Sequence, residues 1–150
     1  MSAEREPEPE CTGKVILRPS HGPLEIDLWC RETPETTRNF IQLCLEGYYE
    51  ECPFHRIVPG FILQTGDPFG NGGESTLDSG SRIKSEWHPR LKFNRRGLVG
   101  MVKMPAEDSK SAGGASQFFN TTSVEAIFGI SPTKHSLTRS TCNSPILSTL

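Results

Sequence analysis

The most informative stretch of this chain is residues 54–67, which read Phe54-His55-Arg56-Ile57-Val58-Pro59-Gly60-Phe61-Ile62-Leu63-Gln64-Thr65-Gly66-Asp67. Two short apolar runs flank Pro59-Gly60. This dipeptide suits the central positions of a type II turn, because proline restricts φ and glycine tolerates a positive φ. The stretch therefore predicts two adjoining strands, residues 54–58 and 61–65.

Side-chain alternation along these strands predicts a mixed polar and apolar patch. Successive side chains of a strand point to opposite faces of the sheet, so Arg56 is expected on one face and His55 and Ile57 on the other. Gln64 and Leu63 are likewise expected on opposite faces of the second strand. An arginine, a glutamine and apolar side chains can then converge. Taken singly, each residue equally suits an ordinary core hairpin with a solvated Arg and Gln, so the specificity lies in the ordered string.

The rest of the chain predicts many short strands and few helices. Apolar runs bounded by turn residues favour strands at residues 14–18, 24–28, 97–102 and 116–121, and the start of another at 127–129. Thr33-Pro34-Glu35 supplies an N-cap, a proline at the first helical position and a carboxylate near the positive end of a helix, which Gly47 would end. This set of elements is typical of an antiparallel barrel or sandwich.

Composition excludes several classes of protein. A chain of 150 residues predicts one domain, and its net charge of −2 implies no general attraction to nucleic acid or an anionic membrane. The acidic, Pro-rich start does not match a signal peptide, and no apolar run approaches the roughly 18 residues of a membrane span. Five cysteines without a C-x-x-C pair and four isolated histidines favour neither a disulfide framework nor a metal site. We therefore expect an intracellular protein without metal or cofactor.

Residues 54–67 resemble the signature of cyclophilin-type peptidyl-prolyl isomerases. Further stretches carry the resemblance, which covers about residues 13–129: Gly72-Gly73-Glu74-Ser75, Ser116-Gln117-Phe118-Phe119, and residues 38–49 and 93–98. The last two are similar to the spliceosome-associated subgroup, in which Glu replaces a Trp of the pocket. The resemblance implies a mainly β fold with helices, namely a cyclophilin-like eight-stranded antiparallel barrel.

The resemblance also implies a site for a proline-containing peptide, with Arg56 as its catalytic residue. The substrate-binding positions that it implies are Phe61, Ile62, Gln64, Val102, Lys103, Gln117 and Phe119. Phe61, Ile62 and Phe119 would form an apolar cup for the proline ring, and the two glutamines would hold the peptide backbone. Val102-Lys103 stands where the family typically has Ala-Asn, so a cation replaces an amide that grips the peptide.

Two parts of the chain depart from the family. Residues 130–150 are rich in Ser, Thr and Pro and predict a disordered tail, just as the Glu- and Pro-rich residues 1–12 predict a disordered lead-in. The stretch between Phe119 and Phe128 is several residues shorter than in the family, which removes the positions of the pocket Trp or Glu, a Leu and a His. An alternatively spliced transcript or an incorrectly assigned reading frame would explain both departures. We expect an incomplete barrel with an unpaired strand edge and reduced stability.

Three functions follow from this sequence. The first is a cyclophilin-type peptidyl-prolyl cis-trans isomerase acting on proline-containing peptides or proteins, with weak activity or none. The alternative is a non-catalytic interaction module that binds spliceosomal proteins in pre-mRNA splicing complexes. A third, a non-functional fragment, follows from residues 120–150. The resemblance places the protein in the nucleus, and otherwise we expect it in the cytoplasm, not secreted and without direct contact to nucleic acid or membrane.

Overall fold

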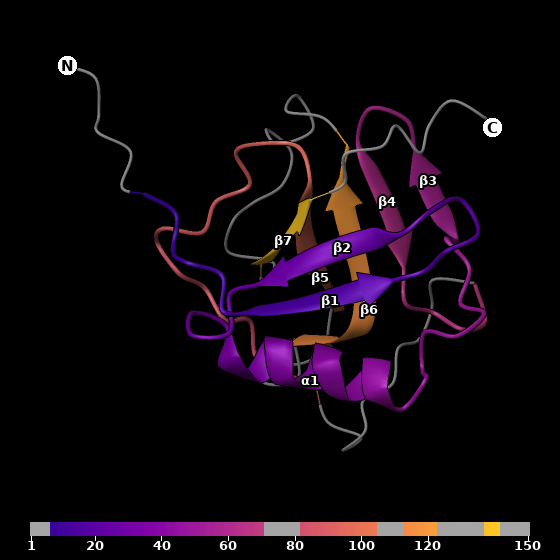
Figure 1. Ribbon diagram of the computed structural model, residues 1–150, viewed down its shortest axis with the longest axis horizontal. Helices are drawn as coiled ribbons and strands as arrows, with labels where there is room; N and C mark the ends of the chain where they lie inside the picture. Colours follow the sequence, from indigo (N-terminus) through magenta and orange to yellow (C-terminus); the bar gives the residue numbers. More distant parts are fainter. Residues whose placement is uncertain (1–6, 71–81, 105–112, 123–136, 142–150) are drawn as a thin grey trace.

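The structure, a computed structural model, describes residues 7–70, 82–104, 113–122 and 137–141, and within these ranges it consists of one antiparallel sheet and one helix (Figure 1). The elements are β1 (Gly13–Leu17), β2 (Leu24–Leu28), α1 (Pro34–Leu45), β3 (Arg56–Val58), β4 (Ile62–Thr65), β5 (Leu98–Met104), β6 (Gly113–Thr121) and β7 (Leu137–Thr141). The strand order is β1-β2-β7-β5-β6-β4-β3. Among the described residues the sheet is open, with β1 and β3 as its two end strands.

The sheet curls, so that β1 and β2 cross in front of β5 and β6 in Figure 1 while α1 lies along one end. The space inside this curl is filled by a cluster that we call the inner core: Leu24, Ile26, Leu28, Phe40, Val99, Met101 and Phe118. The opposite side of the sheet carries a second cluster, the outer core: Trp29, Ile62, Leu91, Phe93, Leu98 and Phe119. Alternation along β5 and β6 sends neighbouring residues such as Phe118 and Phe119 to different cores.

The central hairpin has the turn that its sequence predicts. Gly60 has a φ of +69°, and the amide of Phe61 donates to the carbonyl of Val58 at 3.0 Å. β4 starts one residue later than expected, and β3 is shorter than the expected 54–58 because pairing with β4 begins only at Arg56. The turn fixes the register of this pair, which positions the site described below.

Helix α1 forms where expected but is capped differently. The φ of the N-cap residue Thr33 is −132°, and its hydroxyl makes no cap bond, because it donates to the carbonyl of Trp29 at 3.0 Å. The carboxylate of Glu86 instead accepts hydrogen bonds from the amides of Glu35 and Thr36 at 3.0 and 2.8 Å. Gly47, with a φ of +72°, follows the helix end as predicted. At 12 residues, α1 is too short to cross a membrane, and the described ranges contain no longer helix.

The described residues of the lead-in contact the rest of the fold. Pro9 is buried, and its carbonyl accepts a hydrogen bond from the indole Nε1 of Trp29 at 2.8 Å. Glu8 pairs with Arg95 through two hydrogen bonds of 2.9 and 2.8 Å. Disorder over 1–12 stays a prediction from composition, which does not reveal the partners that Trp29 and Arg95 offer to residues 8–9. Residues 1–6 lie outside the described ranges.

β7 is the described part of the tail. The tail predicted to be disordered contains a strand at Leu137–Thr141, which pairs with β2 on one side and with β5 on the other. Threonine is enriched in strands, so the two threonines of this segment suit the position. Residues 127–129, 130–136 and 142–150 lie outside the described ranges.

Candidate active site

The sheet register aligns three of the predicted site residues in one row. Arg56 of β3 lies opposite Gln64 of β4, and Gln64 lies opposite Phe119 of β6. Phe119 in turn lies opposite Gly100 of β5. Residues directly opposite each other in an antiparallel sheet project from the same face, so this row lies on the side of the outer core. Residues from four separate strands thus meet on one surface.

The two glutamines are bonded to each other. Gln64 Nε2 donates to Gln117 Oε1 at 2.9 Å, and both side chains are buried. This bond fixes the plane of both amides next to Phe119, since Gln117 is two residues before it on the same face of β6. Gln117 Nε2 is a buried donor that has no hydrogen-bond partner in the described residues. The pair presents preset amide groups rather than flexible side chains.

An aromatic stack supports the apolar part of the site. The rings of Phe119 and Phe93 are stacked, with centroids 5.5 Å apart and an interplanar angle of 25°. Ile62 is buried in the same outer core, and Phe61 and Val102 are half-buried against it. Three predicted apolar positions therefore surround the predicted Phe119.

Gly100 makes the stack possible. A Cβ at this position would lie 2.6 Å from Cζ of Phe93 and 2.8 Å from Cζ of Phe119, which is closer than carbon atoms approach. Neither Phe93 nor Gly100 is among the predicted site residues. A glycine inside an apolar strand indicates that another group approaches the backbone closely, so Gly100 could be predicted from the sequence. Nothing in the local sequence indicates Phe93.

Arg56 and Lys103 occupy the two ends of this surface. Arg56 is exposed on the end strand β3 and forms no salt bridge with any described residue. Lys103 is half-buried and lies opposite Gly114, beyond a register shift in β5. It is three residues from Gly100, or about 10 Å along the strand. The structure therefore brings the other predicted residues together and leaves Lys103 at the periphery.

In the described ranges, no three His, Cys, Asp or Glu side chains are grouped so that they could hold a metal ion. The functional groups of the site are one guanidinium, two amides and an aromatic and aliphatic surface. Such a set can bind a neutral peptide, donate hydrogen bonds and hold an apolar ring. It contains no nucleophile and no paired acid and base.

Comparison with known proteins agrees with this geometry. The model of the family described as cyclophilin type peptidyl-prolyl cis-trans isomerase/CLD matches residues 14–130. The peptidyl-prolyl isomerase cwc27 of Rhizopus delemar is 53% identical over 116 residues, which cover 76% of this chain and 21% of that protein. The spliceosome-associated protein CWC27 homolog of Danio rerio is 50% identical over 114 residues, or 76% of this chain and 23% of the relative. This chain thus spans less than a quarter of the length of these relatives.

Solved structures show the same fold. A crystal structure of a Cryptosporidium parvum cyclophilin type peptidyl-prolyl cis-trans isomerase in the presence of the dipeptide Ala-Pro matches with a TM-score of 0.72 and 31% identity. The match covers 87% of this chain and 79% of that one. A second crystal structure of that protein matches with a TM-score of 0.74 and 30% identity, over 86% of this chain and 77% of that one. These findings confirm the predicted resemblance and cyclophilin-like fold, and the chain belongs to the cyclophilin-type peptidyl-prolyl cis-trans isomerase family.

Proposed function

We propose that this chain is a peptidyl-prolyl cis-trans isomerase that acts on proline-containing peptides, with Arg56 as its catalytic residue. The observation that carries the proposal is the row formed by Arg56, Gln64 and Phe119 across three strands. It places a cation at one end of a surface and an aromatic ring at the other. The Cryptosporidium relative, crystallised in the presence of Ala-Pro, supports a proline-containing ligand for such a surface.

The chemistry required is modest, because no bond is broken. Rotation about an X-Pro bond has a barrier of about 20 kcal/mol, since the nitrogen lone pair is delocalised into the carbonyl. A hydrogen bond to the prolyl nitrogen localises that lone pair and weakens the double-bond character. Arg56 suits this role because its guanidinium stays charged and its donors have a fixed geometry. Stabilisation specific to the twisted state accelerates the rotation.

The other residues would hold the two sides of the peptide. Phe61, Ile62, Val102 and Phe119 form an apolar surface that suits a pyrrolidine ring. Gln64 and Gln117 offer amide groups whose orientation is already fixed by their mutual hydrogen bond. Such preorganisation lowers the entropic cost of binding. We expect weaker activity than in the Cryptosporidium relative, because the chain is shorter between Phe119 and Phe128 and carries Lys103 where the family has Asn.

The test is an isomerisation assay on a peptide that contains Ala-Pro, followed by exchange NMR or by protease coupling. Arg56→Ala should lower kcat/KM by about 100-fold or more, because it removes a donor aimed at the reacting nitrogen. The matched control is Arg31→Ala, which removes an exposed arginine before α1 and should leave the rate unchanged. Equal rates for the wild-type chain and Arg56→Ala would refute the catalytic role of this arginine.

A second candidate is a non-catalytic module that binds splicing proteins in the nucleus. The names of the relatives from Danio rerio and Xenopus laevis, both spliceosome-associated, favour it. The same surface would then bind a proline-containing segment without accelerating its rotation. Binding of the Ala-Pro peptide by the wild-type chain, without any rate above the uncatalysed one, would support this candidate. Purification of the tagged chain from nuclei together with splicing proteins would test its partners.

A further inference from the structure

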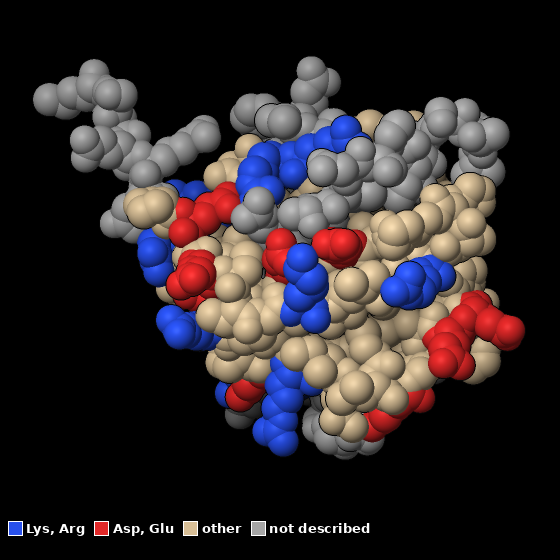
Figure 2. Space-filling model, in the orientation of Figure 1, with Lys and Arg blue, Asp and Glu red and all other residues tan. Residues whose placement is uncertain are grey.

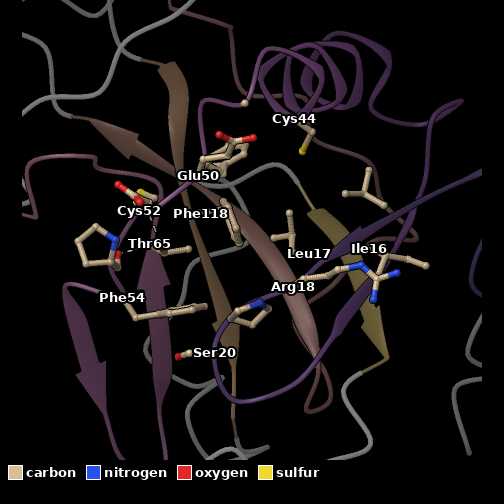
Figure 3. Close-up of a pocket in the computed structure, with 16 residues that line it drawn as sticks. Ile16, Leu17, Arg18, Ser20, Cys44, Glu50, Cys52, Phe54, Thr65 and Phe118 are labelled. Carbon is tan, nitrogen blue, oxygen red and sulfur yellow. Dashed lines mark hydrogen bonds between the residues drawn. The ribbon is translucent and has the colours of Figure 1, made fainter.

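Thr65 ties the end of β4 to the chain that leads into β3. Its hydroxyl donates a hydrogen bond to the carbonyl of Pro53 at 2.9 Å, and the residue is 5% exposed. The sulfur of Cys52 lies 3.8 Å from the same hydroxyl and is a weaker acceptor. Figure 3 shows the Thr65 side chain beside Cys52, with its hydrogen bonds dashed. A buried side chain thus joins two segments of the backbone.

This tie lies beyond the point where the pairing of β3 and β4 ends. The two strands pair at three positions, and the last of them joins Arg56 to Gln64. Thr65 follows Gln64 directly, and Pro53 lies three residues before Arg56. Proline has no amide hydrogen, so Pro53 cannot donate to a strand partner, whereas its carbonyl can still accept. The Thr65 hydroxyl therefore extends the connection between the two strands past their last paired position.

Packing contributes little to holding this segment on the inner-core side, because a cavity of about 820 Å³ lies there. Pro53, Phe54 and Thr65 all line the cavity. Both ring nitrogens of His55 are buried and make no hydrogen bond to any described residue. Among the described residues, only the Thr65 hydroxyl makes a side-chain hydrogen bond to residues 53–55. The start of β3 consequently depends on this bond.

The turn after β4 also lies against Pro53. The amide of Gly70 donates to the carbonyl of Asp67 at 3.0 Å and closes this turn. A Cβ on Gly70 would lie 3.2 Å from Cγ of Pro53, so the turn and the proline ring are in close contact. Both contacts fix Pro53 relative to β4, the strand that carries Gln64.

The position of Arg56 depends on its backbone, because no described carboxylate holds its guanidinium. Figure 2 shows charges of both signs interspersed over the face that carries β1 and β2, where Lys14 pairs with Glu25 and Asp27 at 3.1 and 3.6 Å. Arg56 forms no such pair with a described residue. It starts a strand of three residues at the end of the sheet. Contacts that steady the start of β3 therefore also steady this guanidinium.

We propose that Thr65 is a positioning residue for the isomerisation. Its bond to Pro53 fixes the start of β3 and so holds the Arg56 guanidinium where it can reach the prolyl nitrogen. This inference rests on the proposed function, which gives Arg56 the catalytic role. Thr65 itself touches no substrate, because alternation places its side chain on the face opposite Gln64. Since Arg56 acts on the twisted state of the peptide, Thr65 should affect kcat and not KM.

The test compares Thr65→Val with the wild-type chain in the isomerisation assay. Valine keeps the branched shape of threonine and removes the hydroxyl. We expect kcat to fall about five- to tenfold with KM unchanged within about twofold, the size of effect that the loss of one hydrogen bond produces. Thr65→Ser retains the hydroxyl and should recover most of the lost rate.

Thr37→Val is the matched control for a purely structural effect. Thr37 is similarly buried, at 2% exposed, and its hydroxyl donates to the carbonyl of Thr33 at 2.8 Å in the first turn of α1. This variant should lose thermal stability to a similar extent as Thr65→Val, but its kcat should equal that of the wild-type chain. An equal loss of kcat in both variants would mean that Thr65 has only a structural role.

Nitrogen-15 relaxation of the backbone amides tests the positioning without reference to catalysis. The order parameter of the Arg56 amide should fall in Thr65→Val, whereas that of Val58, next to the turn, should not change. Unchanged relaxation at Arg56 would overturn the inference, as would an unchanged kcat of Thr65→Val when Arg56→Ala slows the reaction. Equal rates for the wild-type chain and Arg56→Ala would instead refute the proposed function, and the relaxation data would still decide whether Thr65 positions Arg56.

Discussion

Gly100 shows how one residue without a side chain determines the shape of the candidate site. It lies opposite Phe119 on β5, at the point where the rings of Phe119 and Phe93 meet. Any larger residue there must displace a ring or the strand. The aromatic surface of the site thus depends on a position that touches no substrate in the proposed mechanism.

We predict that Gly100→Ala destabilises the protein by about 1–3 kcal/mol, because the added methyl group overfills a packed site. It should also weaken binding of a proline-containing peptide, since the Phe119 ring must shift. Urea unfolding and peptide titration measure the two effects. Gly114→Ala is the control, because its Cβ would meet nothing closer than 3.6 Å. Equal stabilities of the two variants would contradict this account of Gly100.

At the scale of single residues, a site residue can be predicted from the sequence when neighbouring residues in the chain indicate its position. Arg56 and Gln64 follow from alternation on either side of a recognisable turn, so their convergence is predictable. The partnership of Phe93 with Phe119 depends on the register between β5 and β6 and on a loop that precedes β5. No local pattern specifies that register, so Phe93 is visible only in the folded chain.

At the scale of elements, α1 depends on a residue about 50 positions away in the chain. The carboxylate of Glu86 accepts hydrogen bonds from two amides in the first turn of the helix, where the helix dipole favours a negative charge. The local sequence Thr33-Pro34-Glu35 correctly predicts where the helix starts. It predicts the wrong cap, because a long-range carboxylate replaces the hydroxyl of Thr33.

We predict that Glu86→Ala lowers the free energy of unfolding by about 1–2 kcal/mol, the usual effect of losing an N-cap. Thermal and urea unfolding would measure it. Glu46→Ala removes an exposed carboxylate at the other end of α1, where a negative charge is unfavourable. Its exposed hydrogen bond with Gln42 is worth little, so this variant should destabilise by less than about 0.5 kcal/mol. A Glu86→Ala protein as stable as the wild type would show that the interaction contributes nothing.

At the scale of the whole molecule, two buried acidic groups, Cys44 and Tyr49, make the free energy of unfolding fall at alkaline pH. Burial raises the pKa of Cys44 to about 11 and that of Tyr49 well above its usual value. Burial favours the neutral form of both groups. Their full contribution to the free energy of unfolding is therefore present below the pKa values that the two groups have in the unfolded chain, near 9 and 10. It is lost as the pH rises through the folded pKa values, because the unfolded chain releases its protons first.

We therefore predict that the free energy of unfolding falls between pH 9 and pH 11, with about 1 kcal/mol due to Cys44, whose partial exposure reduces the effect. Urea denaturation at pH 7, 9 and 10.5 would measure the slope. Cys44→Ala should have a shallower slope than the wild type, because it removes the thiol whose pKa burial raises. A Cys44→Ala slope equal to that of the wild type would contradict the assignment.

The strand β7 has a consequence for how the molecule opens. It alone joins the β1–β2 pair to the rest of the sheet by backbone hydrogen bonds among the described residues, through three paired positions on each side. It also comes from sequence beyond the 14–130 match to the family. If this one strand dissociates, the amino-terminal pair loses its ladder to the sheet in a single event. That pair would then behave as a separate cooperative unit, held among the described residues by apolar packing and able to exchange with solvent well before the surface around Phe119 unfolds.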